Sequence, residues 1–168
     1  FTAGAELNLQ GRFSPSLEWN LGYQYLRTGD RAILQDIRAG EVFGRNNPLG
    51  ATRRMARSDY SGLLGRSPHL LNARLLYAHQ PSGWGGSLRA VYRSRWGVLD
   101  FDGNGFANMP EEFAAGFVML NASVQKSFAK SFTLQLNANN LLNHMDAVNV
   151  PQMPGRHFLL AIHWNFLY

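Results

Sequence analysis

Large apolar residues alternate with polar or small residues in seven separate stretches of the chain. In the stretch LEWNLGYQY, which begins at Leu17, every odd position is apolar and every even position is polar or small. The stretch FTLQLNAN, which begins at Phe132, has the same period of two. This period is typical of a β-strand with one apolar face. The pattern therefore predicts an all-β chain, with strands in AELNLQGRF, LEWNLGYQY, LLNARLLY, SLRAVYRSRW, VMLNASVQ, FTLQLNAN and RHFLLAIHWNFLY.

The connections between these stretches alternate between short and long. Residues 14–16 and the segments HQPSGWG and KSFAKS are short, whereas residues 28–67 and 97–116 form long connections. A soluble β-sandwich also alternates in polarity, but its connections are usually short. Short turns on one side and long loops on the other are typical of a transmembrane β-barrel, which satisfies its backbone hydrogen bonds inside a membrane without a long apolar run. We therefore predict a transmembrane antiparallel β-barrel with long extracellular loops and short periplasmic turns.

Seven strands are an odd number. Single-chain bacterial outer-membrane barrels have an even number of strands, and a seven-stranded sheet has two unpaired edges. The chain also begins inside an alternating pattern, without a signal peptide. We therefore expect these residues to be the final part of a larger barrel, and we expect the first strand of this chain to begin at the cell surface.

Charge and composition narrow the possible functions. The chain has 168 residues, a net charge of +5 and no cysteine, which excludes disulfides and thiolate metal sites. Its basic residues are mostly arginines, and Arg74, Arg89 and Arg93 alternate with apolar positions of a strand, which disfavours nucleic acid as a partner. No arrangement of serine, histidine and carboxylate indicates a catalytic triad, so we predict that the protein is not an enzyme.

The end of the chain carries several family marks. Asn140-Leu141-Leu142-Asn143 leaves the penultimate strand, Pro154-Gly155-Arg156 precedes the last strand, and that strand alternates up to a final aromatic residue. Together with the earlier stretches GRSPHLLNARLLY and AELNLQGRFSPSLEWNLGYQYL, these features resemble the closing strands of TonB-dependent outer-membrane receptors.

The resemblance implies that residues 1–168 are the C-terminal seven strands of a barrel of twenty-two, without its plug domain and N-terminal strands. It also implies a location in the bacterial outer membrane and active import of a scarce nutrient, such as a ferric siderophore, haem or cobalamin. The implied partners are outer-membrane lipid, the outer-membrane assembly machinery and the TonB complex, which would bind the absent N-terminal region. A surface lipoprotein is a candidate partner. The alternative is a passive or structural barrel, such as the membrane anchor of an adhesin.

One long connection contains a calcium-loop pattern. Residues 100–111 match the spacing D-x-[DN]-x-[DN]-G-x5-E, with Gly105 at the position of the sharp turn. The flanking helices of an EF-hand are not predicted, and Asp-Gly and Asn-Gly pairs also occur in ordinary polar turns. The pattern therefore has two interpretations, a structural calcium site and an ordinary polar turn. The expected ligands of the calcium site are Asp100, Asp102, Asn104, Phe106 through its carbonyl oxygen, Asn108 and Glu111.

Three further groups of residues are candidates for function. Arg53 and Arg54, with Arg45 and Arg57 nearby, are candidates for binding an anionic ligand. Alternatively, these arginines contact lipopolysaccharide phosphates or only solvate the loop. His144 is a candidate axial ligand for haem, although a lone loop histidine is more often solvated. In the last strand, the apolar positions resemble the signal by which the outer-membrane assembly machinery recognises a barrel. The alternative is that these residues only complete the lipid-facing surface. These positions are Phe158, Leu160, Ile162, Trp164, Phe166 and Tyr168.

Overall fold

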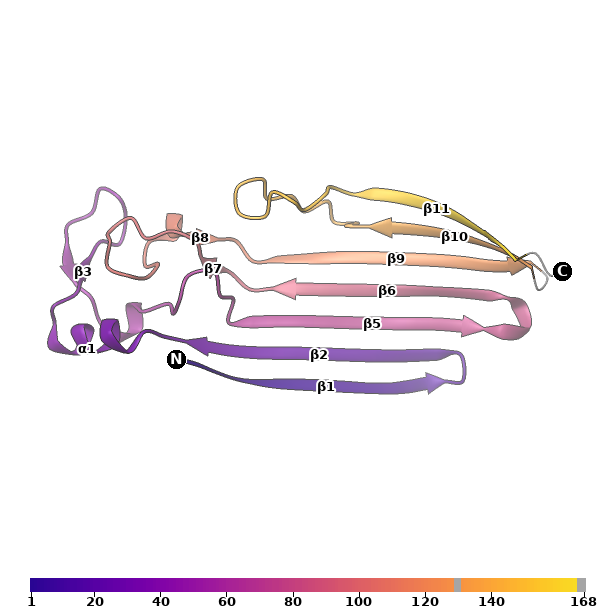
Figure 1. The fold of residues 1–168 in the computed structure, drawn as a ribbon, viewed down its shortest axis with the longest axis horizontal. Coiled ribbons are helices and arrows are strands. Elements are labelled where there is room, and N and C mark those ends of the chain that lie inside the picture. Colours follow the sequence, from indigo (N-terminus) through magenta and orange to yellow (C-terminus); the bar gives the residue numbers. More distant parts are fainter. Residues whose placement is uncertain (129–130, 166–168) are drawn as a thin grey trace. The chain divides into compact units, whose positions relative to one another are not determined.

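Seven long strands form one sheet in the computed structural model, which describes residues 1–128 and 131–165 (Figure 1). The strand order is β1-β2-β5-β6-β9-β10-β11, so each long strand lies beside the next one along the chain. The sheet therefore confirms the predicted all-β class and the seven predicted strands. Their bounds are β1 (Thr2–Ser14), β2 (Leu17–Thr28), β5 (His69–His79), β6 (Trp84–Arg93), β9 (Phe117–Phe128), β10 (Phe132–Asn139) and β11 (His157–Trp164).

Connection lengths follow the predicted alternation. Only a few residues separate β1 from β2, β5 from β6, where the short helix η2 (Gln80–Ser82) lies, and β9 from β10. Residues 29–68, 94–116 and 140–156 form the longer connections. In outer-membrane barrels the short turns face the periplasm and the longer loops face outward.

Strand register places apolar side chains together on one face. Leu136 of β10 pairs with Val124 of β9 on one side and with Leu160 of β11 on the other, and β10 is antiparallel to both neighbours. Large apolar side chains of this face are exposed, which is the requirement for contact with lipid chains. Exposed examples are Leu7, Leu9, Tyr23, Leu75, Leu88, Val124, Leu136 and Leu160.

Lys126 is a charged residue on the apolar face, where it pairs with Leu134. Its ammonium group donates a hydrogen bond to the carbonyl oxygen of Ser82. It also lies 5.0 Å from the ring centroid of Trp84. A lysine near a strand end can extend along an apolar surface while its charge reaches polar partners. Lys126 is therefore compatible with a lipid-facing position beside a short turn.

The chain forms two compact units. The loop unit comprises Phe1–Glu6, Gln24–Leu70 and Arg93–Phe117, and the strand unit comprises Leu7–Tyr23, Leu71–Tyr92 and Val118–Tyr168. The long connections of the loop unit contain short elements that the sequence analysis did not predict. These are α1 (Arg31–Ala39), β3 (Phe43–Gly44), β4 (Arg53–Arg54), η1 (Arg57–Asp59), β7 (Trp96–Gly97), η3 (Pro110–Glu112) and β8 (Phe113–Ala114).

Helix α1 gives the loop unit a small apolar core. Asp30 caps its N-terminus by accepting a hydrogen bond from the backbone N–H of Ala32, and Gly40 ends it with a φ of 77°. These are typical start and stop residues of a helix. The helix buries Leu34 and Ile37. Their partners in the core are Met55, Tyr60 and Phe106.

In the described part of the chain, no helix has the length and hydropathy needed to cross a membrane.

Candidate functional site

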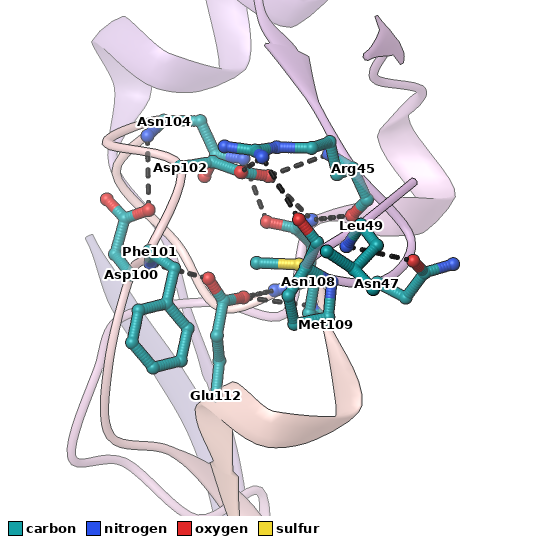
Figure 2. A network of polar contacts seen from close by, with 11 residues as sticks. Arg45, Asn47, Leu49, Asp100, Phe101, Asp102, Asn104, Asn108, Met109 and Glu112 are labelled. Atoms are coloured by element: carbon teal, nitrogen blue, oxygen red, sulfur yellow. Dashed lines mark hydrogen bonds and ion pairs between the residues drawn. The ribbon is translucent and has the colours of Figure 1, made fainter. Parts of the chain in front are cut away.

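A buried carboxylate organises the loop that connects β7 to β8. Glu112 is fully buried, and its Oε1 accepts a hydrogen bond from the backbone N–H of Phe101 at 2.6 Å. Its Oε2 accepts from the backbone N–H groups of Asn108 at 2.6 Å and Met109 at 2.8 Å (Figure 2). A buried carboxylate needs such partners, and these three donors come from both ends of the loop. Glu112 therefore holds residues 101–109 in one conformation.

A second set of contacts joins this loop to the earlier long connection. The backbone N–H of Arg45 donates to Asp102 Oδ2 at 2.7 Å, and its guanidinium Nε donates to Oδ1 at 3.0 Å. The Asn108 amide donates to the carbonyl oxygen of Arg45 at 2.6 Å (Figure 2). Burial raises the pKa of the Asp102 carboxyl, but the hydrogen bonds from Arg45 and Asn108 outweigh burial and hold the pKa below its ordinary value. The ionised form of Asp102 therefore stabilises the connection between the two loops.

The proposed calcium residues take part in this polar network. Asp100 accepts hydrogen bonds from the backbone N–H groups of Asn104 at 3.1 Å and Gly105 at 2.7 Å. The Asn104 amide donates to Asn108 Oδ1 at 2.8 Å. Gly105 has a φ of 91°, which agrees with the predicted sharp turn. These contacts order the segment as a compact polar turn.

The remaining two members of the calcium pattern, Glu111 and Phe106, differ in their exposure to solvent. Glu111 is exposed, whereas its neighbour Glu112 is buried and occupied by backbone donors. The Phe106 side chain is fully buried, and its ring lies 5.0 Å from that of Tyr60. Among residues 1–128 and 131–165, no three histidine or acidic side chains form a group suited to a metal ion. Calcium binding stays a prediction.

The two predicted ligand arginines already have partners within the loop unit. The Arg53 guanidinium makes a bidentate pair with Asp59, with contacts of 2.9 and 2.8 Å. This pair lowers the pKa of the Asp59 carboxyl and raises that of Arg53. Arg54 lies over the ring of Phe43, 5.9 Å from its centroid. Arg53 thus supports the loop fold, and binding of an anionic ligand by either arginine stays a prediction.

The other face of the strand unit is polar. A hollow of about 570 Å³ lies on this face. Within it, Arg89 Nε donates to Asn72 Oδ1 at 2.8 Å, and the hydroxyl groups of Ser87 and Ser123 lie 2.8 Å apart. These side chains are suited to contact water or a polar solute. The hollow is lined by Asn72, Arg74, Ser87, Arg89, Asn121, Ala122, Ser123, Gln135, Asn137 and Asn139.

The opposite face of the same strands is apolar. A groove there is lined mainly by apolar side chains, including Val124, Leu134, Leu136 and Leu160. Leu136 and Asn137 are consecutive residues of β10, yet they belong to the apolar groove and the polar hollow respectively. The sheet therefore has the two contrasting faces of a membrane-barrel wall.

A comparison with protein families agrees with this architecture. A family described as "TonB dependent receptor-like, beta-barrel" matches residues 2–141. The chain belongs to this family. TonB-dependent receptors are outer-membrane β-barrel proteins, so the predicted family, fold and location are confirmed.

Three solved structures share the fold of this receptor chain. The ferric-catecholate import receptor Fiu of E. coli is 18% identical, with a TM-score of 0.66 over 98% of this chain and 21% of that one. The ferric yersiniabactin uptake receptor FyuA of Yersinia pestis is 12% identical, with a TM-score of 0.60 over 99% and 23%. The ferric enterobactin receptor PfeA of Pseudomonas aeruginosa, in a mutant form, is 12% identical, with a TM-score of 0.63 over 97% and 22%.

The chain spans less than a quarter of the length of these three proteins. A search of curated protein sequences finds no match.

The receptor's Asn140 explains one of the family marks in physical terms. This residue is 2% exposed and has a φ of 50°. Its side-chain amide donates to the carbonyl oxygens of His144 at 2.7 Å and Pro154 at 2.9 Å, and its Oδ1 accepts from the His144 backbone N–H at 3.0 Å. Asn140 therefore fixes the start and end of the connection from β10 to β11. His144 lies half-buried in that connection, and its role as a haem ligand stays a prediction.

The last strand carries the predicted assembly residues. Phe158, Leu160, Ile162 and Trp164 share one face of β11, and each is at least 60% exposed. Phe166 and Tyr168 lie outside the described residues. The role of these positions in recognition by the assembly machinery stays a prediction.

The sequence analysis missed the main organising residues of the loop unit. Glu112 lies next to Glu111, which the calcium spacing had selected, and the pairing of Arg45 with Asp102 joins residues far apart in the sequence. Pro110 was an available signal for the short helical turn, because a proline often opens such a turn, but it did not indicate which of the two glutamates is buried. The long-range pair had no local signal.

Proposed function

We propose that the full-length receptor imports a ferric siderophore across the outer membrane, and that these residues form the C-terminal part of its barrel. The observation that carries the proposal is the family match over residues 2–141. Similar folds are found in receptors described as acting on ferric catecholates, ferric yersiniabactin and ferric enterobactin. The proposal is transport rather than catalysis. Its energy source is the TonB complex, acting through a region outside this chain.

Features of the polar face support an anionic or strongly polar cargo. Arg74 and Arg89 line the polar hollow beside asparagine and serine side chains. A guanidinium group offers several fixed N–H donors, which suit the oxygen atoms of carboxylate or catecholate groups. The hydrogen bond from Arg89 to Asn72 holds that guanidinium near the water-facing surface. Such side chains allow a hydrated solute to pass along this face.

Uptake of radioactive iron tests the proposal. Cells that lack their own siderophore receptors would express the full-length protein and receive iron bound to a catecholate or a mixed-ligand siderophore. We expect accumulation of iron that disappears when TonB is deleted or the proton-motive force is collapsed. Accumulation that continues without TonB would instead indicate a passive barrel. Absence of uptake with every siderophore, at normal levels of folded receptor, would contradict the proposed cargo.

A further inference from the structure

The two long connections of the loop unit contact each other directly. Residues 29–68 are the first connection and residues 94–116 are the second. Both belong to one compact unit, although the strands β5 and β6 separate them along the chain. The backbone N–H of Gly65 in the first connection donates to the carbonyl oxygen of Gly97 in the second at 2.8 Å. A Cβ atom at Gly97 would lie 2.9 Å from Leu64 Cδ2, so the two connections are in close contact there.

An apolar core is shared between the two connections. Helix α1 of the first connection buries Leu34 and Ile37. The second connection contributes Phe106, which is fully buried in the same core. Its ring lies 5.0 Å from that of Tyr60 of the first connection. Because an isolated helix shorter than about 12 residues is marginally stable in water, the nine-residue α1 depends on tertiary packing that includes Phe106.

The turn that carries Phe106 fits closely against helix α1. Gly105 precedes Phe106 and has a φ of 91°, a conformation that favours glycine. A Cβ atom at Gly105 would overlap the Cδ1 atom of Ile33, which belongs to α1. The contacts of Arg45 with Asp102 join the same two connections (Figure 2). Apolar and polar contacts therefore both cross from one connection to the other.

We propose that the two long connections open and close as one cooperative body. Neither connection has a complete core by itself, because Phe106 and the side chains of α1 bury one another. Proteins open locally in contiguous cooperative units. A ligand that binds the closed form through one connection therefore reduces the opening of both. The proposal concerns the conformational equilibrium of the loop unit and does not depend on the proposed cargo.

Hydrogen exchange of the unsubstituted full-length receptor in detergent, measured at low concentrations of urea, tests the proposal. Amides of α1 and of residues 101–109 should have the same free energy of opening. They should also share one dependence on urea, because the slope with urea reports the surface exposed by opening. Opening free energies or urea slopes that differ between the two segments would overturn the proposal.

Substitutions in one connection should also be detected in the other. Phe106→Ala should accelerate exchange in α1 by a factor on the order of a hundred or more, because it truncates a buried aromatic side chain. Leu34→Ala should accelerate exchange at residues 101–109 about thirtyfold or more. Acceleration confined to the connection that carries the substitution would contradict cooperative opening. If a core variant does not accumulate as folded receptor, the urea series on the unsubstituted receptor decides.

Exposed residues of the same types provide matched controls. Phe101→Ala truncates a phenylalanine of the second connection that is 59% exposed, and Leu49→Ala truncates a leucine of the first connection that is 99% exposed. Both control variants should leave exchange in the opposite connection unchanged, and equal acceleration by control and core variants would overturn the proposal. Peptides of β9 and β10 should stay protected in all four variants. Acceleration that extends equally to these strands would contradict a separate cooperative loop body.

Discussion

Replacing Glu112 with glutamine is expected to loosen residues 101–109 while the sheet stays folded. The carboxylate accepts three backbone hydrogen bonds and is fully buried. Glutamine keeps one carbonyl oxygen, which can accept two of these bonds, but its NH₂ group faces the third N–H donor. Hydrogen bonds to charged groups contribute about 1.5–3 kcal/mol each, so we expect local opening to become easier by about 2–4 kcal/mol. That change raises the opening equilibrium about 30- to 700-fold.

Hydrogen exchange of the full-length receptor in detergent measures this opening directly. Peptides that contain Phe101, Asn108 and Met109 should exchange faster in Glu112→Gln, while peptides from β9 and β10 should not change. Glu111→Gln is the matched control, because it removes the same charge from the exposed adjacent residue. Equal exchange in the two variants would refute the role assigned to Glu112. Heat-modifiable gel mobility reports separately whether the barrel has formed.

Four further outcomes are expected. The pKa of Asp102 is lowered in the folded state, so its stabilisation is complete above about pH 4 and is lost as the pH falls through the lower folded value. Loop proteolysis by an acid-active protease should therefore accelerate below that pH, and Asp102→Asn should remove the dependence. Asn140→Ala leaves buried carbonyl oxygens without donors and should lower stability by about 2–4 kcal/mol, measured by denaturant unfolding in detergent. If the calcium prediction is right, calorimetry should show a dissociation constant of about 10⁻⁴ to 10⁻³ M that Asp102→Ala removes, whereas identical titrations would contradict it. Phe166→Asp should reduce folded receptor in the outer membrane without reducing synthesis, and unchanged heat-modifiable protein would argue against an assembly signal.

The strands were predictable because each strand face meets one environment. A position two residues along β10 returns to the same face, so Leu134 and Leu136 share an apolar surface, while Gln135 and Asn137 share the polar one. Period-two alternation records that geometry directly in the sequence. The order of strands followed from the connections, because short turns join neighbouring antiparallel strands.

The loop unit was less predictable because its contacts are set by tertiary structure. Helix α1 had local signals in the Asp30 cap and the terminal Gly40, which could have been recognised within the long connection. The choice between Glu111 and Glu112 had no such signal, since spacing alone selected the residue that is exposed. Burial of the neighbouring carboxylate depends on backbone donors brought together by folding of the whole loop. Sequence patterns therefore predicted the membrane wall better than the candidate site.

The central claim is that one face of the sheet contacts lipid while the other faces the barrel interior, and oxygen accessibility of spin labels tests it directly. These 168 residues contain no cysteine. In a full-length receptor without other cysteines, a single introduced cysteine therefore carries the spin label at one known position. Molecular oxygen concentrates among lipid chains. Labels at Leu134→Cys and Leu136→Cys should therefore show high oxygen accessibility in the membrane, and labels at Gln135→Cys and Asn137→Cys should show low accessibility. Uniform accessibility along β10, or maxima at the two polar positions, would contradict the account.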